Sequence, residues 1–173
     1  MKRLVILLVF IFHLFIGVSI SYSQNISGTS IIAPIPVGSL AEYSAIGVGL
    51  AGHSRFFVLE RLGIGFHTAF HYHFGRNGFN GHITIPVRGV AEYYFTDDGA
   101  RIRPYVGGDL GVALSTYSGP FRFYFHWAAG GGALFELSDY IQIVTQFKFS
   151  MMVGSGVAMY LEPSVGFNYI IGY

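Results

Sequence analysis

The sequence predicts an all-β protein, an eight-stranded antiparallel up-and-down transmembrane β-barrel. Only 11% of the residues are charged and 52% are hydrophobic, whereas a soluble domain carries about 25% charged residues. After residue 20 no apolar stretch is long enough for a membrane-spanning helix, and a closed barrel is the other structure that satisfies its backbone groups in lipid. Bulky apolar residues also alternate with small or polar ones, as expected when one face of each strand meets lipid.

The N-terminus, residues 1–23, is predicted to be a signal peptide. Lys2 and Arg3 precede an apolar run over residues 4–20, and small residues follow that run. This order is typical of a cleaved secretory signal. A retained transmembrane anchor is the alternative, but nothing basic follows the run to stop transfer. The barrel domain is therefore predicted over residues 24–173.

The alternation is clearest in the last predicted strand, residues 160–173. One face carries small or polar side chains, namely Glu162, Ser164, Gly166 and Asn168. The other face is bulky and apolar, with Leu161, Val165, Phe167, Tyr169, Ile171 and Tyr173. A strand between lipid and a narrow lumen requires this division.

Seven further strands are predicted upstream, at residues 31–37, 45–58, 63–74, 83–95, 103–115, 121–137 and 140–152. About 10 residues per strand cross a membrane, so eight strands suit a chain of this length. Charges share a face with the glycines, and this face is predicted to point inward because a small barrel has a crowded interior. Pro34 and Pro36 lack ladder donors, so the first segment suits an edge or a strand start.

The connections are predicted to alternate in length. Tight turns are expected on the periplasmic side, at residues 59–61, 96–99 and 137–139. Looser, glycine-bearing loops are expected outside, at residues 75–81, 116–120 and 153–156.

The inward charges are the candidate functional residues. The predicted cluster is Arg88, Glu92, Arg103, Asp109, Arg122, Lys148 and Glu162, with Arg55 and Glu136 on the same face. A static plug is favoured over a gated ion path, because unpaired charge in a narrow lumen is costly. Arg88 and Glu92 lie about 13 Å apart along one strand. Each is therefore expected to pair with a neighbour on the following strand, such as Arg103, Asp109 or Tyr105.

Histidines on one strand form a candidate metal site. His71 and His73, with His67 further back on the same face, place imidazoles about 7 Å apart. Two such residues can bind zinc or copper. Polar filling of the lumen is the favoured interpretation because no third ligand is fixed by the sequence. No metal and no cofactor are therefore expected.

Catalysis is not expected. Acyl hydrolysis or transfer at the outer leaflet needs a serine beside a histidine oriented by a carboxylate. His53 and Ser54 are sequence neighbours and face opposite sides of a strand, and no G-x-S-x-G motif occurs. A lipid-modifying enzyme remains the less favoured alternative.

One strand resembles a known family. Arg103-Pro104-Tyr105-Val106-Gly107-Gly108-Asp109-Leu110-Gly111-Val112-Ala113 resembles the "RPYVGxGxG" strand of small outer-membrane β-barrels of the OmpA/OmpX type, although Asp109 stands where that family often has a small residue. Residues 86–95, 130–132 and the last strand are also similar. The resemblance implies a monomer in the outer membrane of a Gram-negative bacterium. It also implies periplasmic chaperones and insertion by the barrel assembly machinery, with Phe167, Tyr169, Ile171 and Tyr173 as the C-terminal signal.

Composition excludes several functions. The 10 Lys and Arg against 9 Asp and Glu form a near-neutral balance that does not suit a nucleic-acid binder. Cysteine is absent, which excludes disulfides, thiolate metal sites and lipid attachment through cysteine. The predicted function is that of a structural or interaction protein of the cell outer membrane, surrounded by lipid, with a charge-plugged lumen. A narrow channel for small solutes or ions is the alternative.

Overall fold

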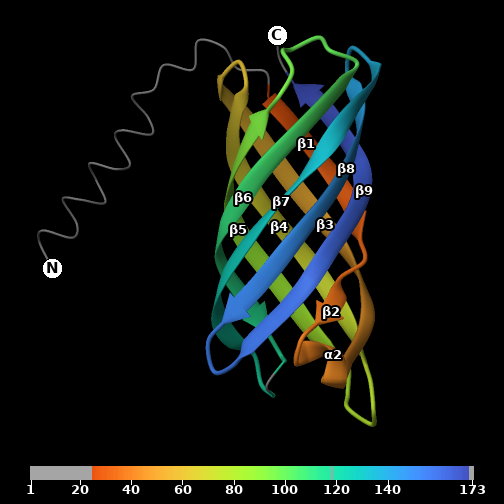
Figure 1. The fold of residues 1–173 in the computed structure, drawn as a ribbon, viewed down its shortest axis with the longest axis vertical. Helices are drawn as coiled ribbons and strands as arrows, with labels where there is room; N and C mark the ends of the chain where they lie inside the picture. Colours follow the sequence, from red (N-terminus) through yellow and green to blue (C-terminus); the bar gives the residue numbers. More distant parts are fainter. Residues whose placement is uncertain (1–24, 118, 172–173) are drawn as a thin grey trace, which may run out of the picture.

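The described residues form a barrel of antiparallel strands with the short helix α2 (Figure 1). The computed structural model describes residues 25–117 and 119–171, so the predicted signal peptide and Tyr173 lie outside the described residues. No helix in the described part of the chain is long and apolar enough to cross a membrane. The elements are β1 (Asn25–Ile32), β2 (Ile35–Val37), α2 (Leu40–Tyr43), β3 (Ser44–Leu59), β4 (Leu62–Gly75), β5 (His82–Tyr94), β6 (Ile102–Ser115), β7 (Arg122–Ser138), β8 (Ile141–Val153) and β9 (Val157–Ile171).

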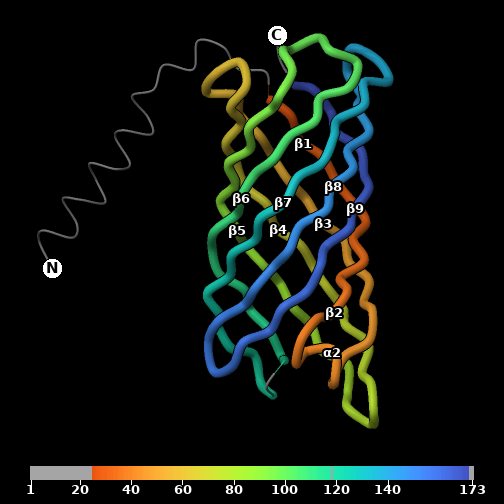
Figure 2. The backbone as a smooth tube through the Cα atoms, in the orientation of Figure 1, coloured from red at the N-terminus to blue at the C-terminus, as the bar shows by residue number. Residues whose placement is uncertain are grey.

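The sheet closes on itself through β9. Each strand from β3 to β8 pairs antiparallel with the one that follows it, and β1 pairs with both β3 and β9. The short β2 also pairs with β9, beyond the end of β1, so β1 and β2 together occupy one position in an eight-stranded ring. Figure 2 shows the tilted path of the strands around the barrel. The predicted fold class is confirmed.

The first strand differs from the prediction. It begins at Asn25 and not at Ile31, and it is interrupted between β1 and β2. At the interruption Ala33 N donates to Pro163 O at 3.0 Å, and Pro34 O accepts from Gly47 N at 2.8 Å. Because Pro34 has no N–H, the ladder cannot continue unbroken through it. The proline therefore splits one barrel strand into two segments.

The connections lie at two ends, which we call the terminal end and the α2 end. The terminal end, where β1 begins and β9 ends, carries the tight turns at residues 60–61 and 139–140. The α2 end carries residues 38–43 and the loops at 76–81, 116–121 and 154–156. The predicted tight turn at 96–99 is wrong, because residues 95–101 form a longer loop in which Asp98 Oδ1 accepts a hydrogen bond from Arg103 Nη1 at 3.0 Å.

The two faces of the strands follow the predicted alternation. Outward side chains are apolar and exposed, such as Phe123 at 78% and Leu50 at 67%, whereas Arg88 and Lys148 are buried in the lumen. Small inward residues make room for the large ones. A Cβ on Gly132 would lie 2.0 Å from Thr145 O and 2.8 Å from Tyr105 Oη, so only glycine fits there.

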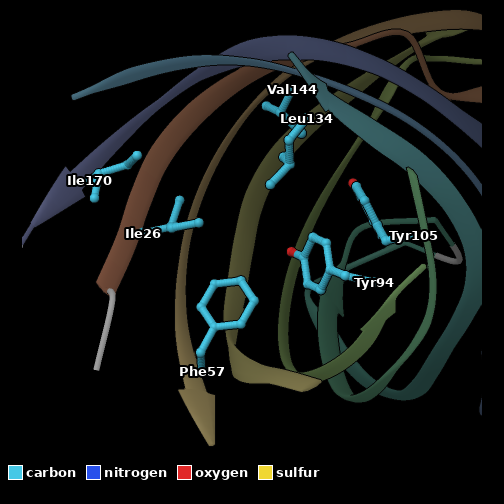
Figure 3. Close-up of a cluster of buried hydrophobic side chains, with 7 residues drawn as sticks. All are labelled: Ile26, Phe57, Tyr94, Tyr105, Leu134, Val144 and Ile170. Carbon is cyan, nitrogen blue, oxygen red and sulfur yellow. The ribbon is translucent and has the colours of Figure 1, made fainter. Parts of the chain in front are cut away.

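Two apolar clusters fill the ends of the lumen, and the sequence analysis did not predict them. The terminal cluster is Ile26, Phe57, Tyr94, Tyr105, Leu134, Val144 and Ile170, whose side chains enter the barrel from seven strands (Figure 3). The α2 cluster is Leu40, Ala113, Tyr124, Met152, Ala158 and Tyr160. Six buried charged side chains lie between these two clusters: Arg55, Arg88, Glu92, Asp109, Lys148 and Glu162.

Candidate functional site

Six charged side chains meet in the middle of the lumen and form what we call the central ion network. Each is at most 4% exposed, and three are cations while three are carboxylates. They come from β3, β5, β6, β8 and β9, so the network spans most of the ring. Its members are Arg55, Arg88, Lys148, Glu92, Asp109 and Glu162.

The first part of the network is a bidentate pair. Arg55 Nε donates to Glu92 Oε2 at 2.7 Å, and Arg55 Nη2 donates to Glu92 Oε1 at 2.8 Å. Tyr94 Oη donates to the same Oε2 at 3.0 Å. Two parallel charge-assisted hydrogen bonds hold a carboxylate in a fixed orientation. Glu92 therefore pairs with β3 across β4, and not with the following strand as predicted.

Lys148 links the parts of the network. Its Nζ lies 2.7 Å from Asp109 Oδ1 and 3.6 Å from Glu92 Oε1. Lys148 is on β8 and Asp109 is on β6, so the side chain must cross the inward face of β7. Gly130 opposes Lys148 on β7, and a Cβ there would lie 3.0 Å from Lys148 Cγ. The glycine leaves the lysine room to cross.

Arg88 joins opposite walls of the barrel. Its Nη1 and Nη2 donate to Glu162 Oε1 and Oε2 at 3.3 and 3.1 Å. Its Nε lies 3.4 Å from Asp109 Oδ2, which agrees with the predicted pairing to the following strand. Nη2 also donates to His67 Nδ1 at 2.5 Å. His67 therefore contacts the central ion network through Arg88.

Two residues of the predicted cluster lie elsewhere. Arg103 is buried near the terminal end, where its guanidinium lies 4.9 Å from the ring centres of both Phe57 and Tyr94. Arg122 is exposed where β7 begins, at the α2 end. The alternation predicts which face a side chain occupies, but it does not predict its height in the barrel. The structure therefore brings Arg88, Glu92, Asp109, Lys148 and Glu162 together, adds Arg55 and leaves Arg103 and Arg122 outside.

A second group of polar side chains lies between the central ion network and the α2 cluster. We call it the histidine layer: His71, His73, His82 and His126. The rings of His73 and His82 stack with centroids 4.4 Å apart, and those of His71 and His73 lie 6.1 Å apart. No three His, Asp or Glu side chains of the described residues are grouped so that they could hold a metal ion. His82 and His126 were not among the predicted metal ligands, although both occupy inward positions of the alternation.

The open space in the lumen is unevenly distributed. A cavity of about 630 Å³ opens at the terminal end and is lined by Asp98, Arg103, Glu136 and Gln142 among others. Beside Arg55 a pocket of only about 10 Å³ remains, which is room for one water molecule at most. The cavity at the terminal end therefore narrows toward the central ion network, where side chains fill the lumen.

The predicted C-terminal signal lies on the outer face. Phe167, Tyr169 and Ile171 are 61%, 58% and 54% exposed on β9, and Tyr173 lies outside the described residues. Their exposure agrees with the outward position that the sequence assigns to them. Recognition of these residues during assembly stays a prediction.

An eight-stranded antiparallel ring with an apolar outer face is a fold found among solved outer-membrane β-barrels. The chain is similar to the crystal structure of Neisserial surface protein A (NspA), with a TM-score of 0.67 and 13% identity over 85% of this chain and 97% of that one. It is also similar to the outer membrane protein OprG from Pseudomonas aeruginosa, with a TM-score of 0.64 and 10% identity over 88% and 97% of the two chains. No protein-family model and no curated protein sequence matches the chain. The resemblance to small outer-membrane barrels is confirmed at the level of the fold.

Proposed function

We propose that the chain is an outer-membrane protein of a Gram-negative bacterium and serves as a structural or interaction barrel with a closed lumen. The apolar outer face and the fold shared with NspA and OprG support the location. The monomeric state and the partners in biogenesis belong to the same proposal. The observation that carries the closed lumen is the central ion network, in which three cations neutralise three carboxylates away from solvent.

A self-neutralised network opposes ion flow. A permeating ion would have to displace a partner such as Glu162 from Arg88, whose side chains are both 0% exposed. Removing one partner of a buried pair costs about 3 to 5 kcal/mol. The apolar clusters close the lumen on either side of the network. Together these layers favour a plug over an ion path.

The lumen also offers poor conditions for catalysis. His53 Nε2 lies 2.6 Å from Asn168 Oδ1, and Ser54 Oγ lies 3.1 Å from Ser27 Oγ, so these two neighbours have separate partners. Ser44 Oγ does lie 3.3 Å from His82 Nδ1. No described carboxylate hydrogen-bonds the other nitrogen of His82, and both residues are buried away from lipid. These contacts support a protein without enzymatic activity.

Conductance in planar bilayers tests the proposal. Refolded wild-type protein is expected to stay silent near neutral pH after insertion. The matched variant is Arg88→Ala combined with Glu162→Ala, which keeps the charge balance but removes the bulk of one pair. Discrete steps from the variant alone support the plug. Discrete steps from the wild type overturn it in favour of the narrow channel.

A further inference from the structure

The histidine layer is linked through one tyrosine to α2, the short helix at the α2 end, which we call the lid. Leu40 is the buried residue of α2 and packs in the α2 cluster with Tyr160. The ring of Tyr160 in turn lies 5.8 Å from that of His71, 5.5 Å from that of His73 and 5.9 Å from that of His126. A single tyrosine therefore contacts both the lid and the histidines.

The imidazoles have few partners. Both ring nitrogens of His71 and His73, Nε2 of His82 and Nδ1 of His126 have no hydrogen-bond partner among the described residues. The other two nitrogens contact neutral hydroxyls: Ser44 Oγ lies 3.3 Å from His82 Nδ1, and Tyr160 Oη lies 3.1 Å from His126 Nε2. All four rings are buried, at 6% exposure or less.

Within residues 25–117 and 119–171, a charge in the layer would have no unpaired carboxylate beside it. The nearest ionised groups are Arg88 on β5, Asp109 on β6 and Glu162 on β9, and all three are already paired within the central ion network. The remaining groups around the layer are hydroxyls that are neutral near pH 7. They are Ser44 from β3, Thr84 from β5, Ser115 from β6, Tyr160 from β9 and Tyr117 from the loop after β6. A protonated imidazole here would meet other imidazoles and not a free carboxylate.

The lid is joined to one neighbouring loop. Asn77 Nδ2 donates to Glu42 O at 2.9 Å, Arg76 Nη1 donates to Ala41 O at 3.3 Å, and Arg76 N donates to Tyr43 O at 3.0 Å. Gly38, with φ of 60°, turns the chain into the helix. α2 and the loop at residues 76–81 are therefore bonded to each other, and Leu40 is the side chain of α2 that is buried in the lumen.

We propose that the histidine layer is a proton sensor that opens this lid. In the neutral layer the rings pack against Tyr160, which shares the α2 cluster with Leu40, and the α2 end stays closed. Protonation places repelling charges in a buried space and favours the open form, in which water reaches them. The proposal concerns the α2 end only and rests on the closed lumen proposed above; the central ion network stays in place. Each imidazole that takes up a proton only in the open form shifts the lid equilibrium about tenfold for each pH unit below about 6.5. The closed lid is thus stable at neutral pH and is lost on acidification.

Thiol labelling measures the opening. The chain has no cysteine, so Leu40→Cys introduces a single buried probe and Glu42→Cys introduces an exposed probe on the same helix. A dithiodipyridine, which reacts with thiols in acid, is added to the folded barrel at about pH 7.5 and at about pH 4, on either side of the titration of free imidazole. The rate at Leu40→Cys relative to Glu42→Cys is expected to rise at least about tenfold in acid.

Two further variants assign the effect. His73→Phe combined with His82→Phe keeps two buried rings and removes their proton sites, so the acid-dependent rise is expected to shrink at least about tenfold. His53→Phe, outside the layer, is the control and is expected to keep the full rise. The proposal is overturned if the acid-dependent rise is unchanged in the double histidine variant. It is also overturned if Leu40→Cys with all its histidines shows no rise in acid, or if it is already labelled fast near neutral pH. The conductance measurement is made on cysteine-free protein near neutral pH, so a failure of the plug is seen separately.

Hydrogen exchange measures the opening of the lid without any substitution. In the unmodified protein the amides of residues 38–43 are expected to exchange faster in acid than the intrinsic pH dependence of exchange allows, while those of β7 do not. Equal protection of residues 38–43 at both pH values, after that correction, contradicts the proposal even if a variant fails to fold.

Discussion

Lys148 Nζ lies 2.7 Å from Asp109 Oδ1, and both side chains are completely buried. The pair connects β8 to β6 across the glycine-bearing face of β7. Asp109 Oδ2 also lies 3.4 Å from Arg88 Nε. The Asp109 carboxylate therefore lies within ion-pair distance of two buried cations, and its removal tests both pairs.

Replacing Asp109 by asparagine should destabilise the barrel strongly. Lys148 and Arg88 would both lose a buried counter-charge, and the free energy of unfolding is expected to fall by about 3 to 5 kcal/mol. Urea unfolding in detergent or lipid measures the change. The control is Asp97→Asn, since Asp97 pairs with Arg61 at side-chain exposures of 57% and 43%. This exposed pair should contribute less than about 1 kcal/mol, and similar losses at the two sites would contradict the central ion network.

An arginine placed on the lipid-facing surface is expected to destabilise the barrel by an amount that depends on its depth in the membrane. Leu110 and Leu137 are both 59% exposed on the outer face, but Leu110 lies within β6 while Leu137 lies near the end of β7. Leu110→Arg is expected to destabilise the inserted barrel by about 2 to 4 kcal/mol, and Leu137→Arg by no more than about 1 kcal/mol. Reversible folding into lipid vesicles gives both values. Equal costs would show that the membrane band is misplaced along the barrel.

The contribution of Arg103 to the stability of the barrel is expected to depend on its planar guanidinium. The group lies 4.9 Å from the ring centres of Phe57 and Tyr94, and its Nη1 donates to Asp98. Arg103→Lys keeps the charge but loses the flat contact with the rings, and stability is expected to fall by about 1 to 2 kcal/mol. Asp98→Asn changes only the half-exposed partner and should cost less. A lysine variant as stable as the wild type would leave no role for stacking.

A charged residue on the outer face of β9 is expected to impair assembly more than the same change on the outer face of another strand. Phe167→Asp is expected to lower the folded fraction in cells, seen as loss of the heat-modifiable fast-migrating band on gels, while export continues. Phe123→Asp is the matched change on β7, where the side chain is 78% exposed. If both variants lose the band to the same extent, the effect comes from lipid exposure and not from recognition of the C-terminal strand.

The sequence predicts the faces of the strands well because a period of two is a local property. It does not predict contacts across the lumen, because these depend on the height of each residue in the closed ring. The pair of Arg55 with Glu92 joins strands that are not neighbours, and no spacing along the chain encodes it. Arg103 was placed on the correct face but at the wrong height.

The first strand was misplaced for a different reason. In β1 the buried positions include Ile26 and Ile32, while Thr29 is exposed on the outer face. This strand supplies apolar residues to the interior of the barrel, so its pattern is partly the reverse of that in β9. A rule that assigns apolar residues to lipid therefore misses it. Pro34 and Pro36 were expected at an edge or a strand start, whereas Pro34 lies at a break within one barrel strand and Pro36 lies in β2, paired with β9.

The contact between Arg88 and Glu162 has a consequence for biogenesis. It joins β5 to β9 across the lumen, so a flat or half-curled sheet cannot form it. Arg88 can pair with Asp109 on the adjacent strand before the edges of the sheet meet, but Glu162 cannot reach Arg88 until they do. Neutralisation of Glu162 by Arg88 therefore requires closure of the barrel, so the last buried carboxylate loses its solvent only when the ring is complete.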